Sequence, residues 1–227
     1  MAADASADSG GGEFAFVGGR VCLDFAATLG RRHTDPVEGL PDTAALARWF
    51  AAAGLLAPEA GLPRVGSAEL ARARALREAL YRLVRAATEG SSYARADVAA
   101  LNRAAARPDL VPQLAFAAGA PGVRWQQRDE AVAALATVAR DGVLLLGGPD
   151  LARVKECGHP ACSLLFVDDS QARRRRWCSM ERCGNLAKVA GYRARVRQGA
   201  RAAVPSRPDG PADSAASAVP GARAAAG

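Results

Sequence analysis

Two pairs of cysteines near the end of the chain constrain its fold most strongly. Each pair has the spacing C-x4-C: Cys157 and Cys162 are followed by fifteen residues and then by Cys178 and Cys183. Such pairs can each form a turn whose sulfurs point to one centre, and four thiolates complete the tetrahedral coordination of Zn(II). We therefore predict one structural zinc ion held by these four cysteines.

Two other interpretations of the cluster stay open at this point. The four thiols could be ordinary buried side chains, or His159, inside the first pair, could replace one cysteine as a ligand. We favour zinc because the pairs are symmetric and the chain has only one further cysteine, Cys22.

A zinc site closed by four cysteines has no open position for water or substrate, which argues against a hydrolase. The sequence also lacks the phosphate-binding glycine motifs, and it has only two histidines, His33 and His159. We expect that the chain is not an enzyme. In a competing hypothesis, Arg20, Asp24 and Arg31 line a catalytic pocket, but buried ion pairs explain these residues more simply.

The positive charge of the chain is concentrated around the cysteines. The 227 residues carry a formal net charge of +7, and residues 1–150 hold 16 basic and 17 acidic side chains. Residues 199–227 hold 3 and 2, whereas residues 151–198 hold 11 and 4. With four thiolates and the metal contributing about −2, this last segment keeps a charge near +5 and favours an anionic partner.

We predict that nucleic acid is this partner. One group of candidate contacts lies between the cysteine pairs and a second on the helix that follows them: Arg173, Arg174, Arg175, Arg176, and Lys188, Arg193, Arg195, Arg197. Two alternatives fit the same charges. The segment could be a zinc-stabilised module that binds an acidic protein, or it could bind RNA rather than DNA.

The composition along the chain predicts four segments. Residues 1–12 and the Ala, Pro and Gly-rich residues 199–227 are expected to be disordered, because they contain too little apolar surface to form a core. Between them we expect a helical domain over 13–150 and the zinc module over 151–198. The start of the chain does not resemble a signal peptide and no long apolar run occurs, so we expect a cytoplasmic protein that does not bind a membrane.

The fold class predicted from hydrophobic periodicity is mainly α with a small β-hairpin in the N-terminal domain. Helices are expected at 20–29, at 42–54, at 67–89 with Ser67 as N-cap, at 95–106 and at 129–147, and two short strands within 110–127. In the zinc module we expect a hairpin that includes an apolar strand at 164–167, a turn at 168–170, and a helix after the last cysteine that Asn185 caps.

The residues also resemble two known sequence families. The string Cys178-Ser-Met-Glu-Arg-Cys183-Gly-Asn185 resembles the bacterial CGNR zinc finger, and Phe16-Val-Gly-Gly-Arg20-x-Cys-Leu-Asp-Phe-x-x-Thr28 resembles the start of the ABATE domain. The resemblance covers about residues 13–198. It departs from the finger motif at one position, where Leu186 replaces an arginine, so a contact made by that arginine is missing here.

This resemblance implies a stress-induced transcription regulator that binds zinc through the same four cysteines and binds DNA through its finger. It leaves the role of the helical domain open. We expect that domain to sense a small-molecule or protein ligand or to form a homodimer.

Overall fold

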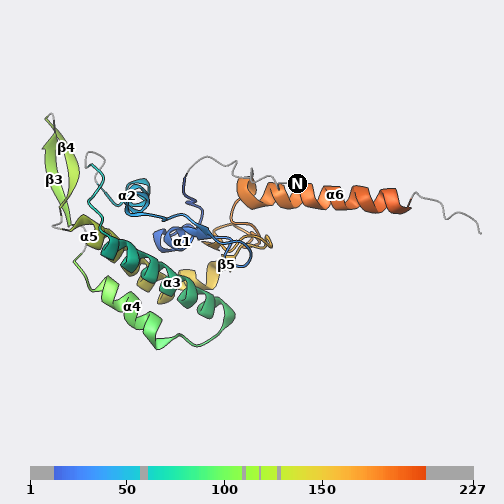
Figure 1. Ribbon diagram of the computed structural model, residues 1–227, viewed down its shortest axis with the longest axis horizontal. Coiled ribbons are helices and arrows are strands. Elements are labelled where there is room, and N and C mark those ends of the chain that lie inside the picture. Colours follow the sequence, from blue (N-terminus) through green and yellow to red (C-terminus); the bar gives the residue numbers. More distant parts are fainter. Residues whose placement is uncertain (1–12, 57–60, 109–110, 118, 127–128, 203–227) are drawn as a thin grey trace, which may run out of the picture. The chain divides into compact units, whose positions relative to one another are not determined.

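The computed structural model describes residues 13–56, 61–108, 111–117, 119–126 and 129–202 (Figure 1). The described residues fall into two compact units, which are divided between Lys188 and Val189 within the last helix. The predicted disordered segments lie almost wholly outside the described residues, although the last helix continues to Ala202.

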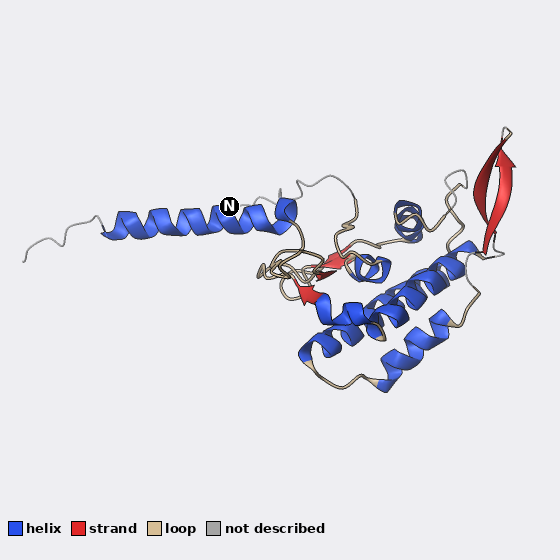
Figure 2. Cartoon of the chain, turned by 180° about the vertical axis from the view of Figure 1, so that it is seen from behind, coloured by secondary structure: helices blue, strands red, loops and turns tan. Residues whose placement is uncertain are grey.

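Helices dominate the fold (Figure 2). They are α1 (Val21–Ala26), α2 (Thr43–Ala52), α3 (Ser67–Glu89), α4 (Arg95–Ala105), α5 (Glu130–Leu146) and α6 (Asn185–Ala202), with a 3-10 turn at Pro149–Arg153 and a π-helical turn at Met180–Gly184. The strands form three antiparallel pairs: β1 (Leu29–Gly30) with β2 (Val37–Glu38), β3 (Val111–Ala117) with β4 (Ala120–Gln126), and β5 (Val154–Glu156) with β6 (Leu165–Val167). The prediction of a mainly α fold with small hairpins is confirmed.

The helix ends follow from local sequence signals. Asp42 caps α2, because its carboxylate accepts a hydrogen bond from the Ala45 backbone N–H at 2.7 Å. Gly90 ends α3 in the left-handed conformation, with φ of +69°. The N-cap of α3 is Gly66 rather than the predicted Ser67, because the Glu69 carboxylate bonds back to the Gly66 N–H at 3.1 Å.

The helical core is formed by α1, α2, α3, α4 and α5, of which α3, α4 and α5 lie side by side (Figure 1). Trp49 is fully buried and its ring lies 4.8 Å from that of Phe25. At Gly142 of α5 an added Cβ would come within 2.4 Å of the Leu80 side chain of α3. The two helices therefore need glycine at this point to approach each other closely.

The first helix is shorter than the sequence predicts. The hydroxyl of Thr28 bonds to the Phe25 carbonyl at 2.7 Å just after α1 ends at Ala26. Leu29, the last residue of the helix expected at 20–29, instead pairs with Glu38 in the short β1–β2 ladder. The extended pairing therefore ends the helix before the apolar periodicity does.

The first cysteine pair lies at the tip of the β5–β6 hairpin. The predicted strand at 164–167 is present as β6, and it pairs with β5, an element that the sequence analysis does not predict. Val154, Leu165 and Val167 of this hairpin belong to the same hydrophobic core as the helices. The Val167 N–H also donates to the Gly18 carbonyl at 2.9 Å, so the hairpin is joined to the segment before α1.

Candidate metal centre

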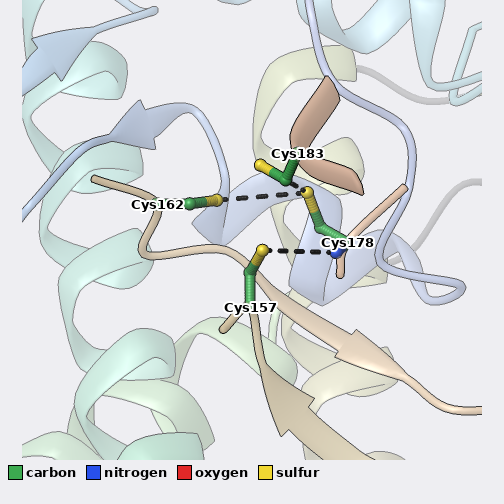
Figure 3. Close-up of side chains that lie close together, drawn as sticks. All are labelled: Cys157, Cys162, Cys178 and Cys183. Carbon is green, nitrogen blue, oxygen red and sulfur yellow. Dashed lines mark hydrogen bonds between the residues drawn. The ribbon is translucent and has the colours of Figure 1, made fainter. Parts of the chain in front are cut away.

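The four predicted ligands converge in a buried cluster (Figure 3). All four sulfurs lie within 4.8 Å of one another, and the distances from Cys178 Sγ are 4.0 Å to Cys162 Sγ and 3.6 Å to Cys183 Sγ. Tetrahedral zinc with Zn–S bonds of about 2.3 Å places its sulfurs about 3.8 Å apart. The spacing therefore fits one tetrahedral zinc ion.

Both cysteine pairs lie in hydrogen-bonded turns that hold the sulfurs in place. In the first turn the Cys157 N–H donates to the Leu164 carbonyl at 2.9 Å, and the Cys162 N–H donates to the His159 carbonyl at 2.8 Å. In the second turn the Cys183 N–H donates to the Ser179 carbonyl at 3.2 Å. The two turns therefore hold their sulfurs around a common centre.

A side chain that the sequence analysis missed caps the second turn. The Ser179 hydroxyl accepts from the Arg182 N–H at 3.0 Å, whereas Asn185, the predicted cap, is the exposed first residue of α6. A serine directly before a helical turn is the usual signal for such a cap.

The surroundings of the sulfurs suit negatively charged ligands. The Cys178 backbone N–H points at the Cys157 sulfur at 3.3 Å, and Cys178 itself is fully buried. Hydrogen bonding from Cys162 lowers the pKa of Cys157, whereas the bond to Cys157 raises the pKa of Cys162.

His159 is not part of the ligand set. Its ring Nδ1 accepts a hydrogen bond from the Ala161 N–H at 3.2 Å and thereby supports the first turn. The group of potential ligand atoms found in the described residues consists of the four cysteines alone. The four cysteines are therefore arranged to bind one metal ion, and an all-sulfur set without an open position is that of structural zinc.

The turn after β6 is organised by one buried carboxylate. Asp168 is 1% exposed, and it accepts from Lys155 Nζ at 2.6 Å, from Ser170 N–H at 3.0 Å and from Arg175 N–H at 3.0 Å. The hydrogen bond from the Lys155 ammonium group holds the pKa of Asp168 well below its usual range. Asp168 therefore fixes the start of the arginine run, and it neutralises one of the basic side chains of the module.

The four side chains of the run Arg173–Arg176 do not all face solvent. Arg175 turns inward, and its guanidinium donates to the Trp177 carbonyl at 2.9 Å, to the Val17 carbonyl at 3.3 Å and to the Cys178 carbonyl. It also lies 4.4 Å above the ring of Phe166. The predicted nucleic-acid contact at Arg175 is thus a side chain that ties the second cysteine pair to the N-terminal segment.

Arg173, Arg174 and Arg176 are exposed, and none of them forms an ion pair with a carboxylate of the described residues. Arg174 and Arg176 border an open hollow of about 450 Å³, which Gly158, Lys155 and Thr88 also line. A second hollow of about 300 Å³ lies against the same arginines, Trp177 and Met180. Positive charge and apolar surface therefore lie next to each other beside the cysteine cluster.

The second group of candidate contacts follows the cluster on α6. Lys188 is exposed, and Leu186, which replaces the motif arginine, is 49% exposed. Arg193 and Arg195 are exposed residues of the second unit. The side chain of Arg197 lies outside the described side chains.

In the competing enzyme hypothesis, Arg20 and Asp24 would line a pocket, and both have structural partners here. Arg20 bonds to Asp141 and Asp150, with its closest contacts at 2.6 and 3.0 Å. Asp24 is buried, and its carboxylate accepts from the Gly18 N–H at 2.7 Å. Arg20 thus forms ion pairs, as the ion-pair interpretation of the sequence predicts.

One unexpected link joins the helices to the module. His33 lies with its Nε2 2.9 Å from a Glu156 carboxylate oxygen and 3.2 Å from the Tyr81 hydroxyl. Arg85 also bonds to Glu156, at 2.5 Å. Glu156 directly precedes the first zinc ligand, and no local sequence pattern predicts this contact.

The fold and the cluster define a helical protein that carries a four-cysteine zinc finger. Residues 19–149 match the family model ABATE, described as "Putative stress-induced transcription regulator", and residues 153–196 match the model of the CGNR zinc finger. The chain belongs to the ABATE family and contains a CGNR zinc finger. No curated protein matches it. None of the helices within the described residues is long and apolar enough to span a membrane.

Proposed function

We propose that this protein is a cytoplasmic transcription regulator that binds DNA through the basic surface beside its zinc cluster. The helical part would sense a ligand or bring two chains together. The description of the ABATE family supports the regulatory role. The proposal assigns the zinc ion to holding the finger in shape, while the exposed arginines carry the contact to phosphate.

The observation that carries the proposal is the pair of outward arginines next to the metal centre. Arg174 and Arg176 form no ion pair with a carboxylate of the described residues. By contrast, Lys155 pairs with Asp168, and Arg153 pairs with Asp169. Free guanidinium groups on a rigid frame match the geometry of backbone phosphates.

The backbone around these arginines is itself held by hydrogen bonds. The Gly158 N–H of the first cysteine turn donates to the Arg176 carbonyl at 2.8 Å. Arg176 also lies 5.0 Å from the ring of Trp177. Binding of the metal therefore fixes the position from which Arg176 reaches a phosphate, and we expect nucleic-acid binding to require zinc.

The test is a salt titration of zinc-loaded protein with duplex DNA, single-stranded DNA and RNA. We expect the Arg174→Ala, Arg176→Ala double variant to bind duplex DNA more weakly and to reduce the slope of log affinity against log salt by about 2. Its zinc content should be unchanged. The matched control removes the same charge from the exposed Arg95 and Arg103 of α4, and it should leave the slope as it is.

Each alternative has its own outcome in this assay. Preference for RNA over duplex DNA would replace DNA by RNA as the partner. Absence of binding to all three nucleic acids by the fully metallated protein would contradict the proposal, and it would favour a module that binds an acidic protein.

A further inference from the structure

The β3–β4 hairpin presents an apolar face that nothing in the described part of the chain covers. Directly opposed residues of an antiparallel pair share a face, and the register pairs Leu114 with Val123, and Phe116 with Pro121; Pro112 lies on the same face of β3. Leu114 and Phe116 are each 72% exposed, and Val123 is 56% exposed. In Figures 1 and 2 the hairpin extends away from the helices beside the start of α5.

An isolated two-stranded hairpin is at best marginally stable in water, and it needs packing on one face to persist. Here neither of the two hydrophobic clusters of the described residues includes a side chain of β3 or β4. Each strand is seven residues long, and Leu114, Phe116 and Val123 on this face point into solvent. A surface of this kind indicates an interaction site.

The terminal segments outside the described residues are poorly suited to cover this face. Residues 1–12 and 203–227 consist mainly of small and polar residues, and their only larger apolar side chains are Met1, Val204 and Val219. A charged partner is disfavoured as well, because the sequence from Val111 to Val123 contains no charged residue that would attract it. A second copy of the chain offers the matching surface, which is equally apolar and uncharged.

The area of the face agrees with a weak dimer. Burial of Pro112, Leu114, Phe116, Pro121 and Val123 would remove on the order of 500 Å² per chain, or about 1,000 Å² in total. This is the lower end of the range for specific interfaces. A two-fold axis through the face would place each hairpin on its counterpart and close the assembly at two chains.

We propose that the apolar face of the β3–β4 hairpin binds the same face of a second copy and forms a two-fold symmetric dimer. The inference rests on the proposed role of the helical part in bringing two chains together, and it is independent of nucleic-acid binding. It names the surface, and it gives the hairpin a cover that the described residues of one chain do not provide.

Sedimentation velocity of full-length, zinc-loaded protein without DNA tests this proposal. We expect a concentration-dependent equilibrium between monomer and dimer. Phe116→Asp and Leu114→Asp should each raise the dissociation constant of the dimer at least about tenfold, because an unpaired carboxylate would be buried in the contact. Both sites are exposed in the monomer, so helix content and zinc content should stay unchanged.

The matched control is Gln113→Asp, which adds the same charge to the same strand on its opposite, exposed face. It should leave the dissociation constant unchanged. A monomer at all concentrations, a dimer that survives Phe116→Asp, or an equal effect of Gln113→Asp would each overturn the proposal. DNA binding is measured separately, so a monomer that binds DNA contradicts the dimer alone, and a dimer that does not bind DNA contradicts the proposed function alone.

Discussion

Replacement of Arg175 by alanine should weaken zinc binding, although Arg175 is one of four consecutive arginines beside the metal site. Its guanidinium donates to the carbonyls of Val17, Trp177 and Cys178, and the last of these residues is a predicted zinc ligand. The same group lies over the ring of Phe166, which is fully buried under the cysteine cluster.

The magnitude follows from these contacts. A hydrogen bond from a charged donor contributes roughly 1.5–3 kcal/mol, but three such bonds from one half-buried group are not additive, and water can replace part of them. We therefore expect Arg175→Ala to lose about 3 kcal/mol of the free energy that stabilises the folded loop. Because folding of the loop and metal binding are coupled, this loss corresponds to a zinc dissociation constant roughly a hundredfold higher.

Competition with a chromophoric zinc chelator measures this constant. Arg175→Lys should fall close to Arg175→Ala, since an ammonium group cannot bond to three carbonyls arranged around a planar fork. Arg174→Ala is the control, because its side chain is exposed and it should bind zinc like the parent protein. Unchanged zinc affinity in Arg175→Ala would refute the assignment of this arginine to the frame of the metal site.

Two further predictions concern stability. Cys178→Ser should abolish stoichiometric zinc binding and also lower the melting temperature of the helices. The reason is that Val154 and Leu165 of the zinc hairpin belong to the helical core. Circular dichroism measures this melting temperature, and an unchanged value would contradict the coupling. Burial raises the pKa of Asp24 from 3.8 to about 6, so the folded state binds a proton that the unfolded state has lost, and stability should fall by about 3 kcal/mol as the pH rises from about 4 to about 6. Urea unfolding should show this decrease in the parent protein, and a decrease that persists in Asp24→Asn would assign it to another group.

The sequence predicts well what depends on spacing and period. The helices at 67–89 and 95–106 follow from apolar residues at three- and four-residue steps, and the structure has them within one residue of these limits. The cysteines converge as their paired spacing requires. Both signals are local, so no knowledge of the remaining chain is needed to interpret them.

The different directions of the four arginine side chains could not be predicted in this way. Four identical side chains carry no pattern, and the direction of each depends on a turn that Asp168 fixes through contacts to Lys155 and Ser170. Strand β5 was missed for a similar reason. Val154-Lys-Glu156 has one apolar residue in three, and it becomes a strand because β6 pairs with it across the cysteine turn.

The shared core of the zinc hairpin and the helices has a consequence for the amount of this protein in a cell. In a finger on a flexible tether, loss of the metal would unfold the finger alone. Here Val154, Leu165 and Val167 pack among the helices, so release of zinc would open apolar surface in the rest of the chain. Opened chains are substrates for proteases, and small losses of stability change abundance severalfold. The zinc supply would therefore help to set how many copies of the protein persist.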